Sequence, residues 1–306
     1  MELKTFKGGL HPPDNKAWSE KKAIEVCPVA EGDELVIHLS QHIGAPAEAC
    51  VKKGDFVKKG QVIGTPKGFV SVPIHASTSG EVIAVEPRIS GNGSKTPAVV
   101  IKADGQDTWD ENLAGADPDT LTPQEIKDRI RNAGIVGMGG ATFPTHVKLS
   151  PPEDKKIDYL ILNGVECEPY LTADHRLMLE DPENIVQGIL IIKKVLGVDK
   201  AIIGIEANKP DAIDVMSKAC EGRGIEVGAL KVQYPQGAEK QLIYALTGRE
   251  VPSGGLPMDC GCVVQNVGTA AAVNDAVRRG IPLVERIATV SGAAIAEPKN
   301  LRIRIG

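Results

Sequence analysis

Residues 134–148 read Gly-Ile-Val-Gly-Met-Gly-Gly-Ala-Thr-Phe-Pro-Thr-His-Val-Lys, and they are the most informative stretch of this chain. Glycine has no Cβ, so such a loop reaches positive φ angles easily and brings its N–H groups close to a ligand. Oriented N–H groups form a nest for phosphate or another electron-rich group. A glycine-rich turn can also be only a tight connection, so the neighbouring segments decide between the two interpretations.

The segment Asn163-Gly-Val-Glu-Cys-Glu-Pro169 favours a binding site. It follows Ile157–Leu162, a short apolar run of the kind that forms a strand buried on both faces. Ligands of open α/β sheets lie beyond the carboxyl ends of such strands. Together with the glycine-rich loop, this segment predicts a nucleotide or flavin pocket.

A helix is expected immediately before the loop. Thr122-Pro123-Gln124-Glu125 has the residues of a capping box, with proline at the first helical position. Ile126 and Ile130 lie four residues apart on one face, and Gly134 follows as a natural terminating residue.

The first 105 residues contain no long amphipathic pattern and read as a β domain. Their β-branched runs are punctuated by glycine, at 34–39, 61–64, 80–85 and 98–101. From residue 121 the pattern changes to alternating helices and strands, typical of a parallel α/β sheet. We expect helices over 181–196, 209–220, 237–246 and 269–279, and strands over 200–205 and 226–233.

The composition of the chain argues against a nucleic-acid-binding, membrane-spanning or secreted protein. The 306 residues are 42% hydrophobic and only 3% aromatic, with 33 glycines, 21 prolines and a net charge of −5. No stripe of Lys and Arg alternates with aromatic residues, so nucleic acid is not an expected partner. The longest apolar run, Ile189–Ile192, is too short to span a bilayer, and the N-terminus has no secretory hydrophobic region.

The six cysteines contain no CxxC pair. A disulfide framework is improbable in an intracellular enzyme of this size, and closely spaced thiolates for an iron–sulfur cluster are missing. Cys260-Gly-Cys262 lacks a second pair of ligands, so no metal site is expected.

Two strands close the sequence, over 287–292 and 301–305. A strand without a partner is a poor way to end a domain, so we expect the chain to be truncated. The expected division is a β domain over 1–105, a linker over 106–120, an α/β domain over 121–284 and the beginning of another β domain over 285–306.

Two phrases in the first domain resemble lipoyl and biotinyl domains, which have the barrel-sandwich hybrid fold. They are Val51-Lys-Lys-Gly-Asp-Phe-Val-Lys-Lys-Gly-Gln-Val-Ile63 and Ala76-Ser-Thr-Ser-Gly-Glu-Val82. In those domains a modified lysine lies on the hairpin between the phrases. Here the hairpin is Gly68-Phe-Val-Ser-Val-Pro73, which has no lysine, so we expect a structural module without a swinging arm.

The chain as a whole resembles the C subunit of the Rnf/Rsx electron-transport complex and, more distantly, the 51-kDa flavoprotein subunit of respiratory complex I. The resemblance rests on Phe6-Lys-Gly-Gly-Leu-His-Pro-Pro13, the glycine-rich loop, the 163–169 segment, Tyr234-Pro-Gln-Gly-Ala-Glu-Lys-Gln241 and Val264-Gln-Asn-Val-Gly-Thr269. It implies an α/β protein with three parts. These are an N-terminal barrel-sandwich hybrid, a parallel-sheet, Rossmann-like FMN- and NADH-binding domain, and the start of an SLBB β-grasp domain.

The resemblance also implies function. The chain would bind FMN, exchange hydride with NADH or NAD⁺, and belong to an ion-translocating ferredoxin:NAD oxidoreductase complex at the cytoplasmic face of the membrane. Two [4Fe–4S] clusters would lie in a missing C-terminal segment, and ferredoxin would be an indirect partner. A soluble flavoprotein such as a cobalamin reductase, and a non-catalytic scaffold subunit with a degenerated pocket, are the alternatives.

Site residues follow from the same resemblance. Glu168 matches a position near the nicotinamide and is the catalytic candidate. The cofactor-binding candidates are Gly137, Gly139, Gly140, Phe143, Lys148, Asn163, Glu166, Cys167, Tyr234, Gly237, Glu239, Asn266 and Thr269. Core packing for Phe143, a solvated surface position for Lys148 and a plain buried thiol for Cys167 are the competing interpretations.

Four positions depart from the complex I pattern. Val165 replaces an aspartate, and Met138 replaces an arginine. Ala238 replaces an acidic residue, and His146 replaces a glycine. Fewer polar groups imply weaker flavin binding or an altered mode of NADH binding.

Overall fold

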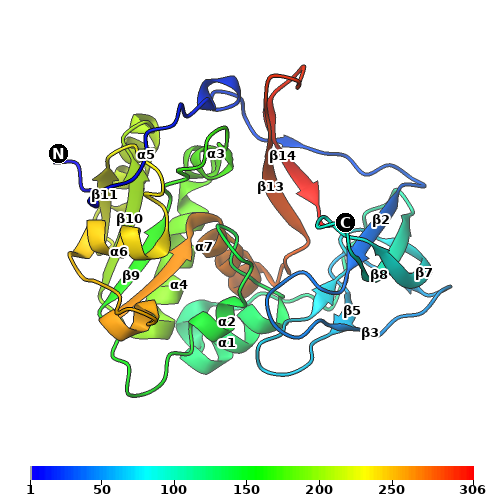
Figure 1. Cartoon of the computed structure of the whole chain (residues 1–306). Coiled ribbons are helices and arrows are strands. Elements are labelled where there is room, and N and C mark those ends of the chain that lie inside the picture. The colour runs from blue at the N-terminus through cyan, green and yellow to red at the C-terminus, as the bar shows by residue number, and fades with distance from the viewer. Residues whose placement is uncertain (1) are drawn as a thin grey trace. The chain divides into compact units, whose positions relative to one another are not determined.

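A four-stranded parallel sheet forms the centre of one of the two units into which the chain divides (Figure 1). The structure is a computed structural model and describes residues 2–306. Unit 1 comprises residues 2–25, 149–274 and 287–301, and unit 2 comprises residues 26–148, 275–286 and 302–306.

The elements of unit 1 alternate between strands and helices, as expected. The strands are β9 (Tyr159–Asn163), β10 (Lys200–Glu206), β11 (Ile225–Leu230) and β12 (Cys262–Asn266). The helices are α3 (Ala173–Glu180), α4 (Pro182–Leu196), α5 (Pro210–Cys220), α6 (Glu239–Thr247) and α7 (Val267–Asn274), with short 3-10 helices η1 (Lys16–Trp18) and η3 (Pro257–Cys260).

The order of the strands reverses at β9. The sheet runs β11-β10-β9-β12, so the chain first moves outward from β9 and then returns to place β12 on its other side. All three pairings are parallel, and the register sets Asn266 opposite Asn163. Ligands of open α/β sheets bind at such a reversal point. The topology therefore marks the carboxyl ends of β9 and β12 as the candidate site.

The central strands are buried, which explains their almost continuously apolar sequences. The apolar side chains of α6 pack on Ile161, Ile202 and Val264 from one face of the sheet. On α4, Gly188 lies so close to α7 that a Cβ would be 1.8 Å from the carbonyl oxygen of Ala270. These two helices therefore pack nearly backbone to backbone.

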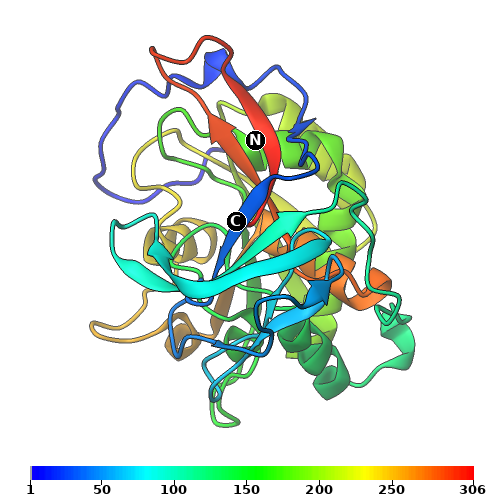
Figure 2. The same cartoon turned by 90° about the vertical axis from the view of Figure 1, so that its right-hand side faces the viewer.

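Unit 2 contains two antiparallel sheets and the glycine-rich loop. One sheet has the order β2-β8-β7-β4 and the other β3-β5-β6. The strands are β2 (Glu34–His38), β3 (Glu48–Ala49), β4 (Phe56–Val57), β5 (Val62–Thr65), β6 (Ile74–His75), β7 (Gly80–Ile89) and β8 (Lys95–Ala103). Figure 2 shows the long antiparallel pair β7 and β8 in cyan.

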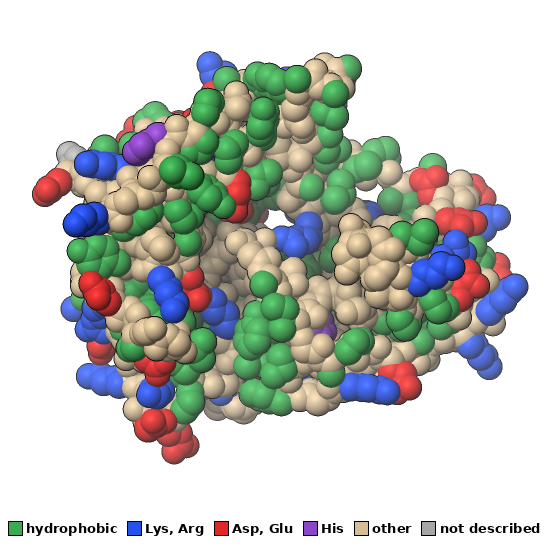
Figure 3. Space-filling view, viewed as in Figure 1, with side chains coloured by type: hydrophobic (Ala, Val, Ile, Leu, Met, Phe, Trp, Pro, Cys, Tyr) green, Lys and Arg blue, Asp and Glu red, His purple; other side chains and the backbone are tan. Residues whose placement is uncertain are grey.

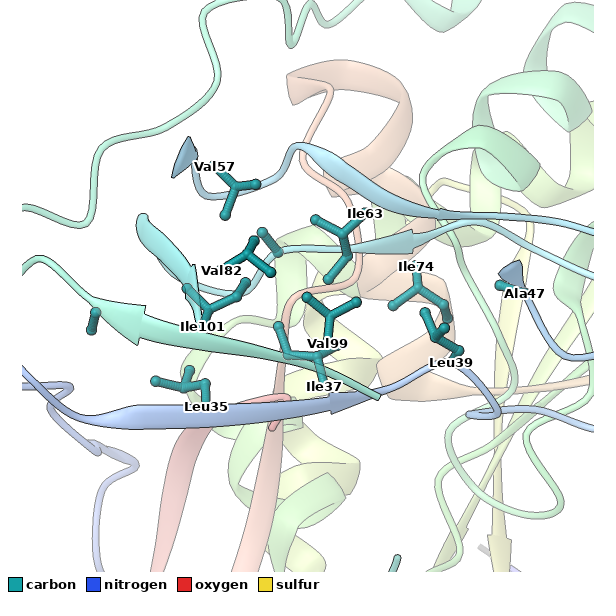
Figure 4. Packing of buried hydrophobic residues seen from close by; sticks show 12 residues of the cluster. Leu35, Ile37, Leu39, Ala47, Val57, Ile63, Ile74, Val82, Val99 and Ile101 are labelled. Carbon is teal, nitrogen blue, oxygen red and sulfur yellow. The ribbon is translucent and has the colours of Figure 1, made fainter. Parts of the chain in front are cut away.

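Alternating side chains from these strands form the core of unit 2. Ile37, Ile63, Val82, Val99 and Ile101 are fully buried and point toward one another (Figure 4). Each buried aliphatic side chain of this size contributes about 1.5–3 kcal/mol relative to an exposed one. The expected β-rich module is confirmed, and within residues 2–105 η1 is the only helical turn.

The helical elements of unit 2 flank the loop. They are α1 (Pro123–Asn132), α2 (Thr145–Lys148), the 3-10 helix η2 (Pro118–Thr120) and a π-helical turn, η4 (Asp275–Arg279). The capping box of α1 is confirmed, since Thr122 accepts from the backbone N–H of Glu125 and Glu125 reaches back to Thr122. Gly134 follows the helix with φ of +70°.

Two helices differ from the sequence-based expectations. Helix α3 was not expected, because 163–181 showed only a polar strand end and a proline. The helix expected over 269–279 is α-helical only to Asn274 and continues as the wider turn η4. By contacts, residues 2–25 group with unit 1, for example through the Lys4 N–H, which donates to the Ala229 carbonyl at 2.9 Å.

The closing strands also differ from expectation, because they do have partners. They are β13 (Glu285–Val290) and β14 (Lys299–Arg304), and they form a sheet of order β1-β14-β13 with β1 (Glu25–Val26). The expectation of unpartnered strands was wrong. It overlooked a strand more than two hundred residues away in the sequence, which no local pattern reveals.

The surface carries charges of both signs. On the face shown in Figure 3, Lys and Arg side chains are interspersed with Asp and Glu. Among residues 2–306, no helix is both long enough and apolar enough to cross a bilayer.

Candidate functional site

Asn163 and Asn266 lie side by side where β9 and β12 end. The Asn163 Nδ2 donates to the Gly237 carbonyl at 2.8 Å, and its Oδ1 accepts from the Val165 N–H at 3.1 Å. The Asn266 Nδ2 donates to Asp174 Oδ2 at 2.6 Å. The two amide side chains thus link the strand ends to the segments before α6 and within α3.

The N-terminus of α7 is capped from within the protein. The Asn266 Oδ1 accepts from the backbone N–H groups of Gly268 (2.8 Å) and Thr269 (3.3 Å). Thr269 is fully buried. A phosphate at this helix end would share these N–H groups with Asn266, so the phosphate-binding role of Asn266 and Thr269 stays a prediction.

Glu166 is buried and adopts a positive φ of 50°, which a residue other than glycine rarely takes. Its carboxylate accepts from the backbone N–H groups of Asp174 (2.8 Å) and His175 (3.4 Å). A negative charge is stabilised at the start of a helix, here α3. Glu166 therefore ties the segment after β9 to α3.

Cys167 and Gly237 are in direct contact close to Asn163, at the end of β9. The Gly237 N–H donates to the Cys167 Sγ at 3.3 Å, and burial raises the pKa of this thiol. A Cβ on Gly237 would lie 3.3 Å from both Cys167 Sγ and Val165 Cβ. A methyl group here would force these atoms to move by a few tenths of an ångström, so glycine suits the close approach of the two segments.

Two buried lysines hold the backbone of this segment, and neither was expected from the sequence. The Lys209 Nζ donates to the Val165 carbonyl at 2.7 Å, and the Lys16 Nζ donates to the Glu168 carbonyl at 3.0 Å and to that of Leu171. Burial lowers the pKa of Lys16. The segment 165–171, which presents Cys167 and Glu168, is therefore fastened near both ends by ammonium groups.

Glu206, at the end of β10, supplies the opposing charge. Its Oε2 lies 3.5 Å from the Lys209 Nζ, and its Oε1 accepts from the Gln233 N–H at 3.2 Å. Burial raises the pKa of this carboxyl, although Lys209 and Lys16 oppose the rise. Like Asn163, Glu206 is a polar residue at the end of an apolar strand, so the same sequence pattern could have identified it.

A cavity of about 60 Å³ lies beside this charged cluster, within unit 1. Lys16, Glu206, Asn208 and Cys167 line it, together with residues of the N-terminal segment around Asp14. A space of this size can hold ordered water. The segment 165–171 is therefore supported by the buried lysines as well as by the apolar core, in which Val165 lies and on which Cys167 packs.

The remaining candidates of unit 1 lie around this centre. Glu168 is exposed, and Tyr234 is 38% exposed and pairs with Leu10 through the backbone. Glu239 is the first residue of α6. Unit 1 thus brings Asn163, Glu166, Cys167, Gly237 and Asn266 into one hydrogen-bonded cluster, while the ligand contacts expected of these side chains stay predictions.

The glycine-rich loop belongs to unit 2, where its base is closed by backbone contacts. Val136 and Pro144 form an antiparallel bridge, and the Gly137 N–H donates to the Phe143 carbonyl at 2.9 Å. Between them, Gly139 and Gly140 are exposed. A Cβ on Gly140 would meet no atom within 4 Å.

Arg286 contacts the backbone of the loop at Met138, the position at which the complex I pattern has an arginine. Its Nη2 donates to the Met138 carbonyl at 2.6 Å, within unit 2. Phe143 is half-buried, and Lys148, also half-buried, is the last residue of α2. The roles of Gly137, Gly139, Gly140, Phe143 and Lys148 toward a cofactor stay predictions.

Each unit has, by itself, one feature that suits a flat, anionic cofactor such as FMN. The space before Gly140 is open, so a ligand can approach the backbone of the loop. The polar strand ends Asn163 and Asn266 lie at the reversal point of the sheet.

Two known protein domains match this sequence. Residues 4–106 match the domain described as the RnfC barrel sandwich hybrid domain, and residues 130–275 match the Nuo51 FMN-binding domain. The second match contains both the glycine-rich loop and the carboxyl ends of β9 and β12.

Curated relatives match along nearly the whole chain. The C subunit of a proton-translocating ferredoxin:NAD(+) oxidoreductase complex from Clostridium ljungdahlii is 55% identical over 99% of this chain and 66% of its own length. The C subunit of a Na(+)-translocating ferredoxin:NAD(+) oxidoreductase complex from Acetobacterium woodii is 52% identical over 99% of this chain and 68% of its own length. The chain thus spans about two thirds of these relatives.

Among solved structures, an NAD+-reducing [NiFe]-hydrogenase is similar to part of the chain. The similarity has a TM-score of 0.50 and 25% sequence identity, and it covers 62% of this chain and 38% of the hydrogenase chain.

Proposed function

Since the chain belongs to the RnfC family, the C subunits of the ion-translocating ferredoxin:NAD oxidoreductase complexes, we propose that it binds FMN and exchanges electrons with NAD(H). The family resemblance seen in the sequence is therefore confirmed. The match to an FMN-binding domain agrees with a component of an oxidoreductase. The observation that carries the proposal is the pair Asn163 and Asn266, set in register at the reversal point of the parallel sheet.

Residues of the glycine-rich loop and of the end of β9 would both contact FMN. Gly137, Gly139 and Gly140 would allow the loop backbone to approach the cofactor, with Lys148 toward its phosphate or ribityl oxygens. Asn163, Cys167 and Gly237 would contact the cofactor from the end of β9. FMN would supply one- and two-electron redox chemistry, which side chains lack.

Glu168 is the proposed neighbour of the nicotinamide. It is exposed, and its backbone carbonyl is held by Lys16, so the residue is presented outward from a fixed segment. A carboxylate at this position would orient NAD(H) by accepting hydrogen bonds.

We further propose that the chain works as a peripheral component of a membrane complex, on its cytoplasmic face. The names of the relatives support this, because they describe subunits of ion-translocating complexes. Ferredoxin and the membrane subunits are the proposed partners.

The test is a titration of the purified chain with FMN, followed by flavin fluorescence. Gly140→Val should weaken binding at least about tenfold, because a branched side chain fills the space that an approaching ligand needs. Gly91→Val is the matched control, since Gly91 also has open space around it and lies on the β7–β8 turn. Addition of NADH without oxygen should then bleach the bound flavin.

No uptake of FMN by the unaltered chain, even at millimolar excess, would contradict the proposal and favour a non-catalytic scaffold. Equal affinity in the Gly140→Val variant would remove the loop from the site.

A further inference from the structure

The hairpin of the barrel-sandwich module, Gly68–Pro73, touches both flanks of the glycine-rich loop within unit 2. Arg131, in the last turn of α1 before the loop, donates from Nη2 to the Gly68 carbonyl at 3.1 Å. His146, in α2 after the loop, lies 3.0 Å from the Phe69 carbonyl through Nε2. Arg131 and His146 lie on opposite sides of the loop in the sequence. Both thus contact one hairpin, at two adjacent carbonyl groups.

The contact with His146 is specific in its chemistry. A carbonyl oxygen only accepts hydrogen bonds, so the His146 Nε2 must carry the hydrogen. Burial lowers the pKa of His146, which favours a neutral ring at neutral pH. The Phe69 ring adds an edge-to-face contact, with ring centroids 5.7 Å apart and planes at 84°.

The start of the loop also packs on the module. A Cβ on Gly134 would lie 2.8 Å from the Pro73 carbonyl oxygen and 3.3 Å from the His75 Nδ1. The Thr145 N–H donates to the Ile135 carbonyl at 3.0 Å, which draws the two flanks of the loop together. The module therefore contacts the loop at its first glycine, Gly134, and after its last one, at His146.

We propose that this hairpin is a clamp that fixes the spacing between the flanks of the glycine-rich loop, with Arg131 and His146 as positioning residues for the cofactor. The part of the proposal that concerns FMN rests on the proposed function. A loop held in its binding conformation loses less entropy when a ligand binds, and this preorganisation strengthens affinity. The clamp also gives a role to His146, the residue that departs from the glycine of the complex I pattern.

The experiment compares His146→Gly with His146→Gln, which keeps a side-chain N–H donor. Amide hydrogen exchange of residues 137–143 is measured in the ligand-free protein, and FMN affinity is measured separately. Loss of the hydrogen bond in His146→Gly should speed exchange in the loop about five- to tenfold. Exchange in β7 and β8 should stay unchanged, and His146→Gln should restore part of the protection.

A second pair of variants separates the clamp from a general loss of stability. Phe69→Ala removes the ring contact, while Phe56→Ala removes another exposed phenylalanine of the same module, on β4. Only Phe69→Ala should speed exchange in the loop and weaken FMN binding, by about threefold.

The outcomes distinguish this proposal from the proposed function. Unchanged exchange at 137–143 in both His146→Gly and Phe69→Ala would overturn the clamp. If His146→Gly unfolds the module, Phe69→Ala against Phe56→Ala decides the question. Faster exchange in the loop of a protein that takes up no FMN would support the clamp and contradict the flavin site.

Discussion

The Lys209 Nζ lies 2.7 Å from the carbonyl oxygen of Val165, and both residues are fully buried. The same ammonium group contacts Asn208 Oδ1 at 2.9 Å and Glu206 Oε2 at 3.5 Å. A buried charge is tolerated only where such partners replace its water. Lys209 therefore joins the ends of β9 and β10 beneath the candidate site.

Replacing Lys209 by Met should destabilise unit 1 strongly. The change leaves the Glu206 carboxylate and the Val165 carbonyl without this donor, and breaking a buried ion pair costs about 3–5 kcal/mol. Urea unfolding measures the loss. Lys156→Met, at a side chain that is 90% exposed, is the control and should change stability little. The double variant Lys209→Met with Glu206→Gln should lose less than Lys209→Met alone, and an additive loss would contradict the coupling.

Gly237→Ala should disturb the contacts at the end of β9 without unfolding unit 1. The new methyl group would meet Cys167 Sγ and Val165 Cβ at 3.3 Å, so these atoms must move by a few tenths of an ångström. We expect a stability loss of about 1–3 kcal/mol, as for other overpacked positions, together with weaker FMN binding. Adding Cys167→Ala should recover part of the stability, because it makes room for the methyl group. No recovery would mean that the strain lies elsewhere.

Gly188→Ala should be among the most damaging single changes in unit 1. Its Cβ would lie 1.8 Å from the Ala270 carbonyl oxygen, so α4 and α7 would have to separate. The expected loss is more than about 3 kcal/mol, at the upper end of overpacking effects. Thermal unfolding measures it, with Lys193→Ala on the partly exposed side of α4 as the control. A stability equal to that of the unaltered chain would contradict the close helix packing.

His75 should make unit 2 less stable at acidic pH. Burial lowers the pKa of His75 from 6.5 to about 4. Between these values the unfolded chain binds a proton that the folded chain does not, so stability falls as the pH falls from 6.5 to 4. The contribution of this one group is about 3 kcal/mol over the window. Urea unfolding of the unaltered chain and of His75→Gln from pH 7 to pH 4 should show a shallower decline in the variant. Parallel curves would mean that His75 does not titrate in this way.

Local patterns were sufficient to predict much of the fold. The capping box at Thr122 and the apolar run before Asn163 depend on a few neighbouring residues, and both appear in the structure. The strand–helix alternation after residue 121 gave the parallel sheet. The polar end of β9 led to Asn163, which the register then places opposite Asn266.

The charged support beneath the site could not be predicted in this way. Lys16 and Lys209 read as ordinary surface residues, because lysine is rarely buried without a partner. Their partners are backbone carbonyls at Glu168 and Val165, which no sequence pattern marks. The pairing of β1 with β14 likewise joins the two ends of the sequence, and only the three-dimensional structure shows it.

The placement of β12 has a consequence for how the sheet is assembled during synthesis. Asn266 pairs with Asn163, which lies 103 residues earlier, so one side of β9 stays uncovered until the later strand has left the ribosome. Contacts of such high sequence separation form slowly, and an uncovered strand edge is prone to pair with other chains. Nascent chains that stop short of β12 should therefore aggregate, or recruit chaperones, more than those that include it.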